Sequence, residues 1–389
     1  EAYWQEWSAR STYDGAYQEA VQRSLLTLKS LTFGPTGGIA AAATTSLPES
    51  IGGTRNWDYR FCWLRDATLV LQSLLSAGYG EEAEAWTGWL LRAVAGSPKQ
   101  LQILYGLGGE RLLPELELNW LPGYEHSGPV RIGNAASGQF QLDVYGEIMS
   151  ALHAARAAGI PLDRNAWELQ RAILGQLLVV MDEPDSGLWE IRAEPRHFTH
   201  SRVMVWVAFD RAVKDAEAYG FEGDVALWRR MRDQVHAEVC EKGWSEQRQS
   251  FIQAYGSEEL DAAVLVMPSV GFLPADDPRM VATVEAITGD LRFDCLVARY
   301  DSGKALDGLP PGEGAFLPCS FWLVSALALG GRLEEATELF EKLLGLRNDV
   351  GLLAEEHDGQ RMLGNFPQAF SHLALVDAAT TLDQASRRG

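Results

Sequence analysis

The chain has few cysteines, few basic residues and no long hydrophobic segment, and each shortage argues against a class of protein. Its four cysteines are far apart and form no CxxC pair, which favours neither zinc binding nor a disulfide framework: Cys62, Cys240, Cys295 and Cys319. Lysine and arginine number 33 against 53 acidic residues, and the net charge of −20 would repel nucleic acid and anionic membranes. No apolar run approaches the ~20 residues that span a bilayer, and no leader opens the chain. We therefore expect a cytoplasmic protein, with a processed or trimmed start because residue 1 is Glu.

A helical pattern of apolar residues recurs along the whole chain. In one segment Leu227, Met231, Val235 and Val239 recur every four residues, as on one face of a helix. Similar stripes predict about twelve helices, near residues 12–31, 63–79, 82–95, 137–159, 164–182, 198–220, 223–241, 258–270, 277–290, 318–330, 332–346 and 367–385. Alternation with period two is scarce, so the sequence predicts an all-α protein.

Twelve helices joined by alternately short and long connections can pair into six hairpins that close into an (α/α)6 barrel. The long loops would then converge on a funnel-shaped active site at one end: 32–62, 97–136, 183–197, 291–317 and 347–366. The pattern alone leaves an irregular helical bundle or a solenoid open as alternatives.

The segment from Arg55 to Asp66 alternates aromatic rings with charged side chains where a helix should begin. Sugars need both, because pyranose faces stack on aromatic rings while hydroxyl groups need fixed hydrogen-bonding partners. The alternative is a buried aromatic cluster with one structural pair of Arg65 and Asp66.

Carboxylates lie beside aromatic residues and glycines in the long loops. Breaking a glycosidic bond needs one protonated and one ionised carboxyl group. Glu190 follows Trp189 after a tight turn, and the aromatic neighbour can raise its pKa by excluding water. Glu355 and Glu356 are adjacent, so only one is expected to enter the site, and spacing does not choose between them. No residues have the spacing of a metal site, a phosphate loop or a dinucleotide fingerprint, so neither metal nor cofactor is expected.

Several ordered motifs resemble glycoside hydrolase family 15, in its bacterial glucoamylase-like and trehalase-like branch. They occur at residues 55–66, 120–125, 187–190, 198–201 and 355–372, and the likeness extends from about residue 12 to 385. The resemblance implies an (α/α)6 barrel and hydrolysis of an α-glucosidic bond with inversion to β-D-glucose. Bacterial relatives carry a β-sandwich domain before the barrel. This chain has no room for one, so we expect residues 1–389 to form a single catalytic domain.

The resemblance also implies roles for individual residues. Glu190 corresponds to the general acid and Glu355 to the general base, although Ala354 stands where Ser is common. Their carboxyl groups are expected roughly 6.5–9.5 Å apart, which leaves room for the attacking water. Arg65 and Asp66 would grip the terminal glucose. Further candidates for contact with the substrate are Trp63, Trp120, Glu125, Trp189, Arg299 and Glu356.

The expected substrate is an oligosaccharide or a disaccharide. We expect a glucoamylase-like enzyme that releases β-D-glucose from the nonreducing ends of malto- or isomalto-oligosaccharides. The alternative within the family is an α,α-trehalase, because these substrates share the terminal ring and differ only beyond it. Remoter alternatives are an α/α-barrel disaccharide phosphorylase and a non-catalytic sugar-binding protein. The sequence specifies no oligomeric state.

Overall fold

The computed structural model describes residues 1–94, 98–161, 164–304 and 307–388, and helices dominate it. Its α-helices are α1 (Ala2–Ser8), α2 (Gln18–Ser30), α3 (Leu64–Ser76), α4 (Gly80–Val94), α5 (Asp143–Ala157), α6 (Arg164–Val180), α7 (Thr199–Tyr219), α8 (Val225–Lys242), α9 (Pro278–Asp290), α10 (Leu317–Leu329), α11 (Leu333–Leu344) and α12 (Ala369–Ser386). The 3-10 helices are η1 (Pro98–Gln100), η2 (Tyr124–His126), η3 (Ala135–Gly138), η4 (Ala262–Val266) and η5 (Ser302–Lys304).

The strands are two residues each and lie in the connections between helices. They are β1 (Cys62–Trp63), β2 (Leu104–Tyr105), β3 (Leu116–Glu117), β4 (Arg131–Ile132), β5 (Trp244–Ser245), β6 (Ser250–Phe251), β7 (Arg292–Phe293), β8 (Leu296–Val297), β9 (Ala315–Phe316), β10 (Glu356–His357) and β11 (Met362–Leu363). Four antiparallel pairs form from consecutive strands, and β9, β10 and β11 form a three-stranded sheet. In that sheet Glu356 lies opposite both Phe316 and Leu363, which fixes the direction of the neighbouring Glu355.

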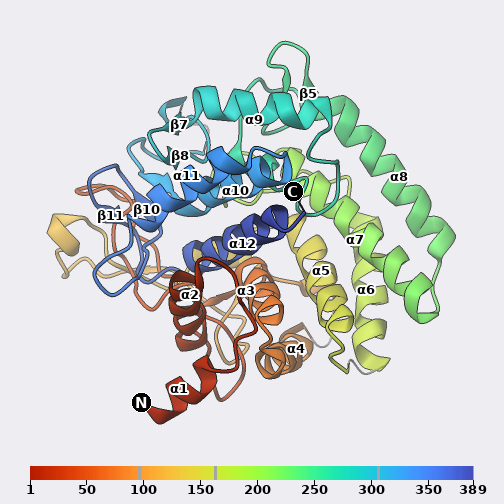
Figure 1. Cartoon of the computed structure of the whole chain (residues 1–389), viewed down its shortest axis with the longest axis horizontal. Helices are drawn as coiled ribbons and strands as arrows, with labels where there is room; N and C mark the ends of the chain where they lie inside the picture. Colours follow the sequence, from red (N-terminus) through yellow and green to blue (C-terminus); the bar gives the residue numbers. More distant parts are fainter. Residues whose placement is uncertain (95–97, 162–163, 305–306, 389) are drawn as a thin grey trace.

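The helices form two concentric rings, which confirms the predicted all-α barrel. Around the inner ring each element contacts the next, in the order α3, α5, α7, η4, α10, α12 and back to α3. The outer ring consists of α2, α4, α6, α8, α9 and α11, and Figure 1 shows α8 and α9 at the periphery. Inner helices such as α10 are buried on nearly every side, whereas the outer α11 buries one stripe of Ala336, Leu339, Phe340 and Leu343. An inner helix packs against both its inner-ring neighbours and the outer ring, whereas an outer helix packs on one side only and exposes the other to solvent.

One inner position departs from the prediction of an α-helix over residues 258–270. The structure has the short 3-10 helix η4 there, followed by turns. The Asp261 side chain caps η4 by accepting from the Ala263 N–H at 2.8 Å. Pro268 lacks an N–H donor, and Gly271 has a φ of +81°, so the segment cannot continue as a helix.

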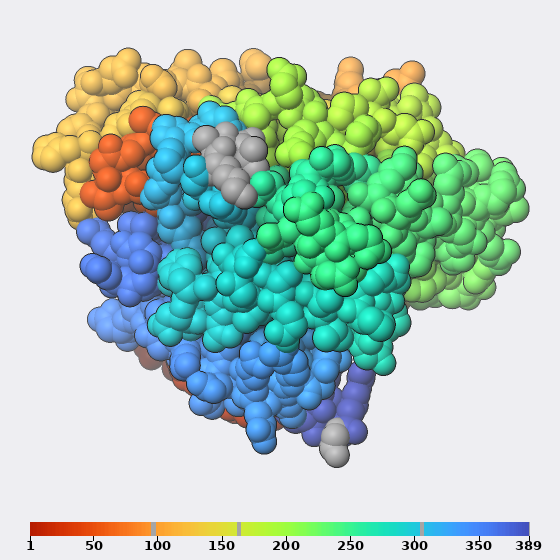
Figure 2. Space-filling view, turned by 90° about the horizontal axis from the view of Figure 1, so that it is seen from above, coloured from red at the N-terminus to blue at the C-terminus, as the bar shows by residue number. Residues whose placement is uncertain are grey.

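All five predicted long loops gather at the end of the barrel where the inner helices begin. Figure 2 shows segments near residues 50, 115–135, 307–312 and 350–360 side by side on one part of the surface. The N-termini of α3 and α12 both supply side chains to the pocket formed there. Within the described residues, we find no helix with the length and apolar character needed to cross a membrane.

Candidate active site

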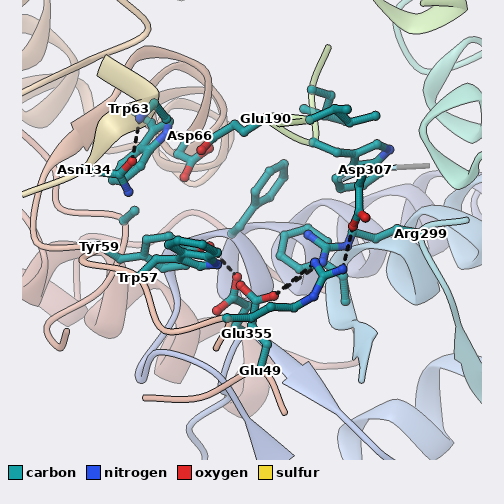
Figure 3. Close-up of a pocket in the computed structure, with 18 of the residues that line it drawn as sticks. Glu49, Trp57, Tyr59, Trp63, Asp66, Asn134, Glu190, Arg299, Asp307 and Glu355 are labelled. Carbon is teal, nitrogen blue, oxygen red and sulfur yellow. Dashed lines mark hydrogen bonds and ion pairs between the residues drawn. The ribbon is translucent and has the colours of Figure 1, made fainter. Parts of the chain in front are cut away.

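A pocket opens at the loop end of the barrel, and each of the five long loops contributes to it. Examples from the five loops, in chain order, are Tyr59, Asn134, Glu190, Arg299 and Glu355. Figure 3 shows Trp63, Asp66 and Glu190 on one side and Trp57, Tyr59, Glu49 and Glu355 on the other. The pocket therefore has carboxyl groups on two opposed walls.

Glu190 is held at the end of a tight turn with its carboxyl group in the pocket. Its backbone has a φ of +57°, and its N–H donates to the carbonyl of Gly187 at 3.1 Å. The Trp63 indole N–H donates to its Oε1 at 2.6 Å, and an Arg65 nitrogen lies 3.7 Å from the same oxygen. Burial raises the pKa of Glu190 above its usual value, although Arg65 and Trp63 act in the opposite direction. A carboxyl group in these surroundings can hold a proton for donation.

Glu355 occupies the opposite wall, immediately before β10. The Tyr59 hydroxyl donates to its Oε1 at 2.8 Å, and the Asn365 N–H donates to its Oε2 at 3.3 Å. Both hydrogen bonds stabilise the ionised form. Burial, and next the nearby Glu49 carboxylate, nevertheless raise the pKa of Glu355 well above its usual value.

Arg65 and Asp66 lie in the first turn of α3 and both line the pocket. The Arg65 Nε donates to Asp66 Oδ1 at 2.9 Å, and its Nη1 donates to the carbonyl of Leu188 at 3.0 Å. Arg65 thus ties α3 to the loop that carries Glu190. The pair offers fixed donors and acceptors to a bound polar ligand.

Trp189 and Arg299 also line the pocket and contact each other. The Arg299 guanidinium lies 5.6 Å from the centre of the Trp189 ring and 2.5 Å from an oxygen of Glu313. The Trp189 indole N–H lies 2.9 Å from both oxygens of Asp261, the residue that caps η4. The shortened inner element therefore fixes the residue that precedes Glu190.

Three sequence-predicted candidates lie outside the set of residues that line the pocket. Glu356 is fully buried behind it, accepting from the Gly314 N–H at 2.8 Å with Arg299 at 3.4 Å. Its side chain points away from the pocket because successive residues of an extended segment face opposite sides. Trp120 is 75% exposed, and Glu125 pairs with Arg361 at 2.9 Å on the surface. Their loop reaches solvent beyond the pocket wall.

Several pocket residues were not singled out from the sequence. These include Glu49, Arg55, Trp57, Tyr59, Arg192 and Asp307. Trp57 and Tyr59 lie within the aromatic segment that was recognised, so their alternation with charged residues was the available signal. No sequence signal pointed to Glu49, because the loop that carries it shows neither periodicity nor a motif. Only the fold brings it beside Glu355.

Among the described residues, one group places enough oxygens together to be tested as a metal site. Glu49, Glu355 and Glu356 each offer an oxygen, and these lie within 4.8 Å of one another. A guanidinium nitrogen of Arg299 lies 3.6 Å from Glu49 and 3.4 Å from Glu356. That fixed positive charge opposes a cation, so the donor set fits a metal poorly.

The fold and the pocket together define a class of protein. It is an α/α toroid in which carboxyl groups face one another across a pocket, at the end of the barrel where the inner helices begin. The chain belongs to the glycosyl hydrolases family 15, whose family model matches residues 15–380. The trehalase of Mycobacterium tuberculosis is 44% identical over 390 residues, covering 98% of this chain and 57% of that protein. The trehalase of Thermoplasma volcanium is 40% identical over 386 residues, covering 98% of this chain and 61% of that protein. The chain thus spans about three fifths of the length of these curated relatives.

Solved structures share the fold at low sequence identity. A bacterial glucoamylase in complex with acarbose has a TM-score of 0.74 at 14% identity, covering 97% of this chain and 58% of that chain. The glucoamylase of Saccharomycopsis fibuligera has a TM-score of 0.69 at 11% identity, covering 94% of each chain. At such low identity, these similarities support the barrel fold of this chain but do not indicate its substrate.

The curated relatives correct one sequence prediction. We expected a glucoamylase-like enzyme acting on malto- or isomalto-oligosaccharides, but the relatives at 32% to 44% identity are named trehalase. The prediction was wrong because the motifs behind it were expected to contact the terminal glucose, which trehalose and those oligosaccharides share. The part of a substrate that differs lies beyond that ring.

Proposed function

We propose that this chain is the catalytic part of an α,α-trehalase, which hydrolyses trehalose to two glucose molecules. The choice of trehalose as substrate rests on the 44% identity, over nearly the whole chain, to the trehalase of Mycobacterium tuberculosis. The chemistry is supported by the two opposed acids in the pocket, Glu190 and Glu355. Trehalose is an uncharged disaccharide, so the net charge of −20 does not oppose its binding.

The proposed mechanism is a single displacement. Water held by Glu355 attacks one anomeric carbon while protonated Glu190 donates to the departing glycosidic oxygen. Glu355 accepts a proton from the water as the carbon–oxygen bond to the second glucose breaks. Glu190 ends ionised and Glu355 ends protonated, and exchange with solvent restores both.

The terminal glucose would contact the wall formed by Arg65, Asp66 and Trp63. Arg65 and Asp66 present a donor and an acceptor that are already fixed to each other at 2.9 Å, so binding orders few side chains. The Trp63 ring supplies an aromatic surface, while its N–H is engaged with Glu190. Arg299 and Trp189 are proposed to line the space for the second glucose.

A substrate panel tests the proposal. Purified protein is incubated separately with trehalose, maltose and isomaltose, and released glucose is measured. We expect trehalose to be hydrolysed with a kcat/KM at least about tenfold above that of the other two. Hydrolysis of maltose or isomaltose with no action on trehalose would overturn the proposed substrate. The Glu190→Gln variant is the control for contaminating activity.

A further inference from the structure

A third carboxyl group, Glu49, faces the pocket and has no role in the mechanism above. Its side chain is buried, and its Oε2 has no hydrogen-bond partner among the described residues. One oxygen each of Glu49, Glu355 and Glu356 lies within 4.8 Å of the others. Figure 3 shows Glu49 directly beside Glu355. Three buried carboxyl groups so close together strongly oppose one another's ionisation.

The positive charge in this wall is insufficient to pair every acid. Arg55 and Arg299 are surrounded by five buried or half-buried carboxyl groups, those of Glu49, Asp307, Glu313, Glu355 and Glu356. Arg55 lies 2.6 Å from Asp307 and 2.8 Å from Glu313. Arg299 lies 2.5 Å from Glu313. Arg299 also lies 3.4 Å from Glu356. From Glu49 the same two guanidinium groups are 3.8 Å and 3.6 Å away, so Glu49 has the longest contacts of the four acids that pair with them.

Glu355 differs from the other two members of the cluster because each of its carboxyl oxygens has a donor. It accepts from the Tyr59 hydroxyl at 2.8 Å and from the Asn365 N–H at 3.3 Å. Glu356 accepts from the Gly314 N–H at 2.8 Å, but its Oε1, like Oε2 of Glu49, has no hydrogen-bond partner among the described residues. Burial raises the pKa of all three acids, that of Glu49 to about 7 and those of Glu355 and Glu356 well above the usual value. Because Arg299 lies closer to Glu356 (3.4 Å) than to Glu49 (3.6 Å), these contacts favour Glu49 as the site of a proton shared by the cluster.

We propose that Glu49 is a positioning residue that carries a proton at neutral pH, so that Glu355 faces a neutral group and stays ionised. This inference rests on the proposed function, because it assigns Glu355 the role of base. An ionised Glu49 would repel the charge on Glu355 and drive it toward protonation, in which state it cannot accept a proton from water. The protonated Glu49 removes that repulsion while leaving a hydrogen-bond donor in the wall.

The charged and titratable groups around Glu49 and Glu355 come from four segments of the fold. They are Arg55 and Tyr59 in the first long loop, Glu190 in the third, Arg299 and Glu313 in the fourth, and Glu356 in β10. The test therefore changes Glu49 and leaves these groups in place.

The experiment compares Glu49→Gln and Glu49→Leu with the wild type, using the pH dependence of kcat/KM on trehalose. Glutamine mimics a protonated carboxyl group and keeps a donor, so we expect the acid limb, which reports protonation of Glu355, to remain within about 0.3 pH unit of the wild type. Leucine is also neutral, so we expect its acid limb to stay similarly close to that of the wild type. A fall of about one unit in either variant would show that Glu49 is normally ionised and would overturn the proposal.

An infrared difference spectrum tests the same proton without any turnover. Wild type minus Glu49→Gln at about pH 6.5 should show extra protonated-carboxyl C=O absorption, and extra carboxylate absorption would contradict the proposal. Glu84→Gln, at an exposed position on α4, is the matched control for both experiments. It should change neither limb of the pH profile of kcat/KM. If the wild type hydrolyses no glucoside, the proposed function fails, while the infrared comparison still decides whether Glu49 holds the proton.

Discussion

The rings of Tyr59 and Trp63 meet edge to face at 5.4 Å, and each ring donates a hydrogen bond to one of the two opposed acids. The Tyr59 hydroxyl binds Glu355 and the Trp63 indole binds Glu190. One short segment of chain therefore supplies a hydrogen bond to each of the two carboxyl groups, from two rings that contact each other.

This arrangement predicts opposite effects of two conservative substitutions on the width of the pH profile. Each lost donor stabilised a carboxylate, so each substitution raises the pKa of its partner by about one unit. Trp63→Phe should move the alkaline limb, which reports loss of the Glu190 proton, to higher pH and widen the profile. Tyr59→Phe should move the acid limb of Glu355 to higher pH and narrow it. The measurement is kcat/KM on trehalose against pH, and movement of the same limb in both variants would contradict the assignment.

The acid role of Glu190 predicts a dependence on the leaving group. Glu190→Gln should lower kcat on trehalose by about 10²–10⁴-fold, because the departing sugar oxygen needs a proton. α-Glucosyl fluoride has a better leaving group, and its hydrolysis should fall far less. The matched control is Glu194→Gln, an exposed acid in the same loop. Equal losses on both substrates would argue against proton donation by Glu190.

The close approach of Gly364 to Glu355 allows a test of how precisely the Glu355 carboxyl group must be positioned. It has a φ of +75°, and a Cβ added there would lie 2.7 Å from the Cβ of Glu355 and press on its carboxyl group. Gly364→Ala should displace that group and lower kcat by about 100-fold. Gly359→Ala is the control, because Gly359 has a φ of +95° in the same hairpin with open space around it. Similar losses in both variants would assign the effect to backbone strain instead of the clash.

The stability of the barrel should depend on pH through Glu147 on α5. Burial, and next the charge of Asp143, raise the pKa of Glu147 to about 8, whereas an unfolded chain has an ordinary value of about 4.3. The folded form thus keeps a proton that the unfolded form loses, and the free energy of unfolding decreases as pH rises from about 4.3 to 8, by up to a few kcal/mol. Glu147→Gln has no such proton. Its melting temperature relative to the wild type should rise across that window, and a constant difference would contradict the pKa assignment.

The stereochemistry of the products tests the single displacement. Inversion at one anomeric carbon of trehalose gives one β-glucose, and the departing half is released as α-glucose. Proton NMR early in the reaction should show the two anomers in about equal amounts. Early α-glucose alone would show retention and would contradict direct attack by water held on Glu355.

Local sequence patterns predicted much of this molecule. The helix stripes depend on side chains three and four residues apart, so eleven of the twelve predicted segments contain an α-helix in the described part of the chain. Residues 258–270 are the exception, because the cap at Asp261 and the proline at 268 favour a short 3-10 helix where the apolar pattern predicted an α-helix. The aromatic segment before α3 predicted pocket residues because its neighbours in sequence are also neighbours in space.

The sequence by itself determined the helices, the family resemblance that implied their ring, and the loops that carry Glu190 and Glu355, since motifs and periodicity are properties of contiguous residues. Only the tertiary structure decided that Glu355 enters the pocket while Glu356 turns away to Arg299. It alone also brought Glu49 beside them from 306 positions earlier in the chain. Charges interact through space, so the protonation of a buried cluster depends on distances that no local pattern contains.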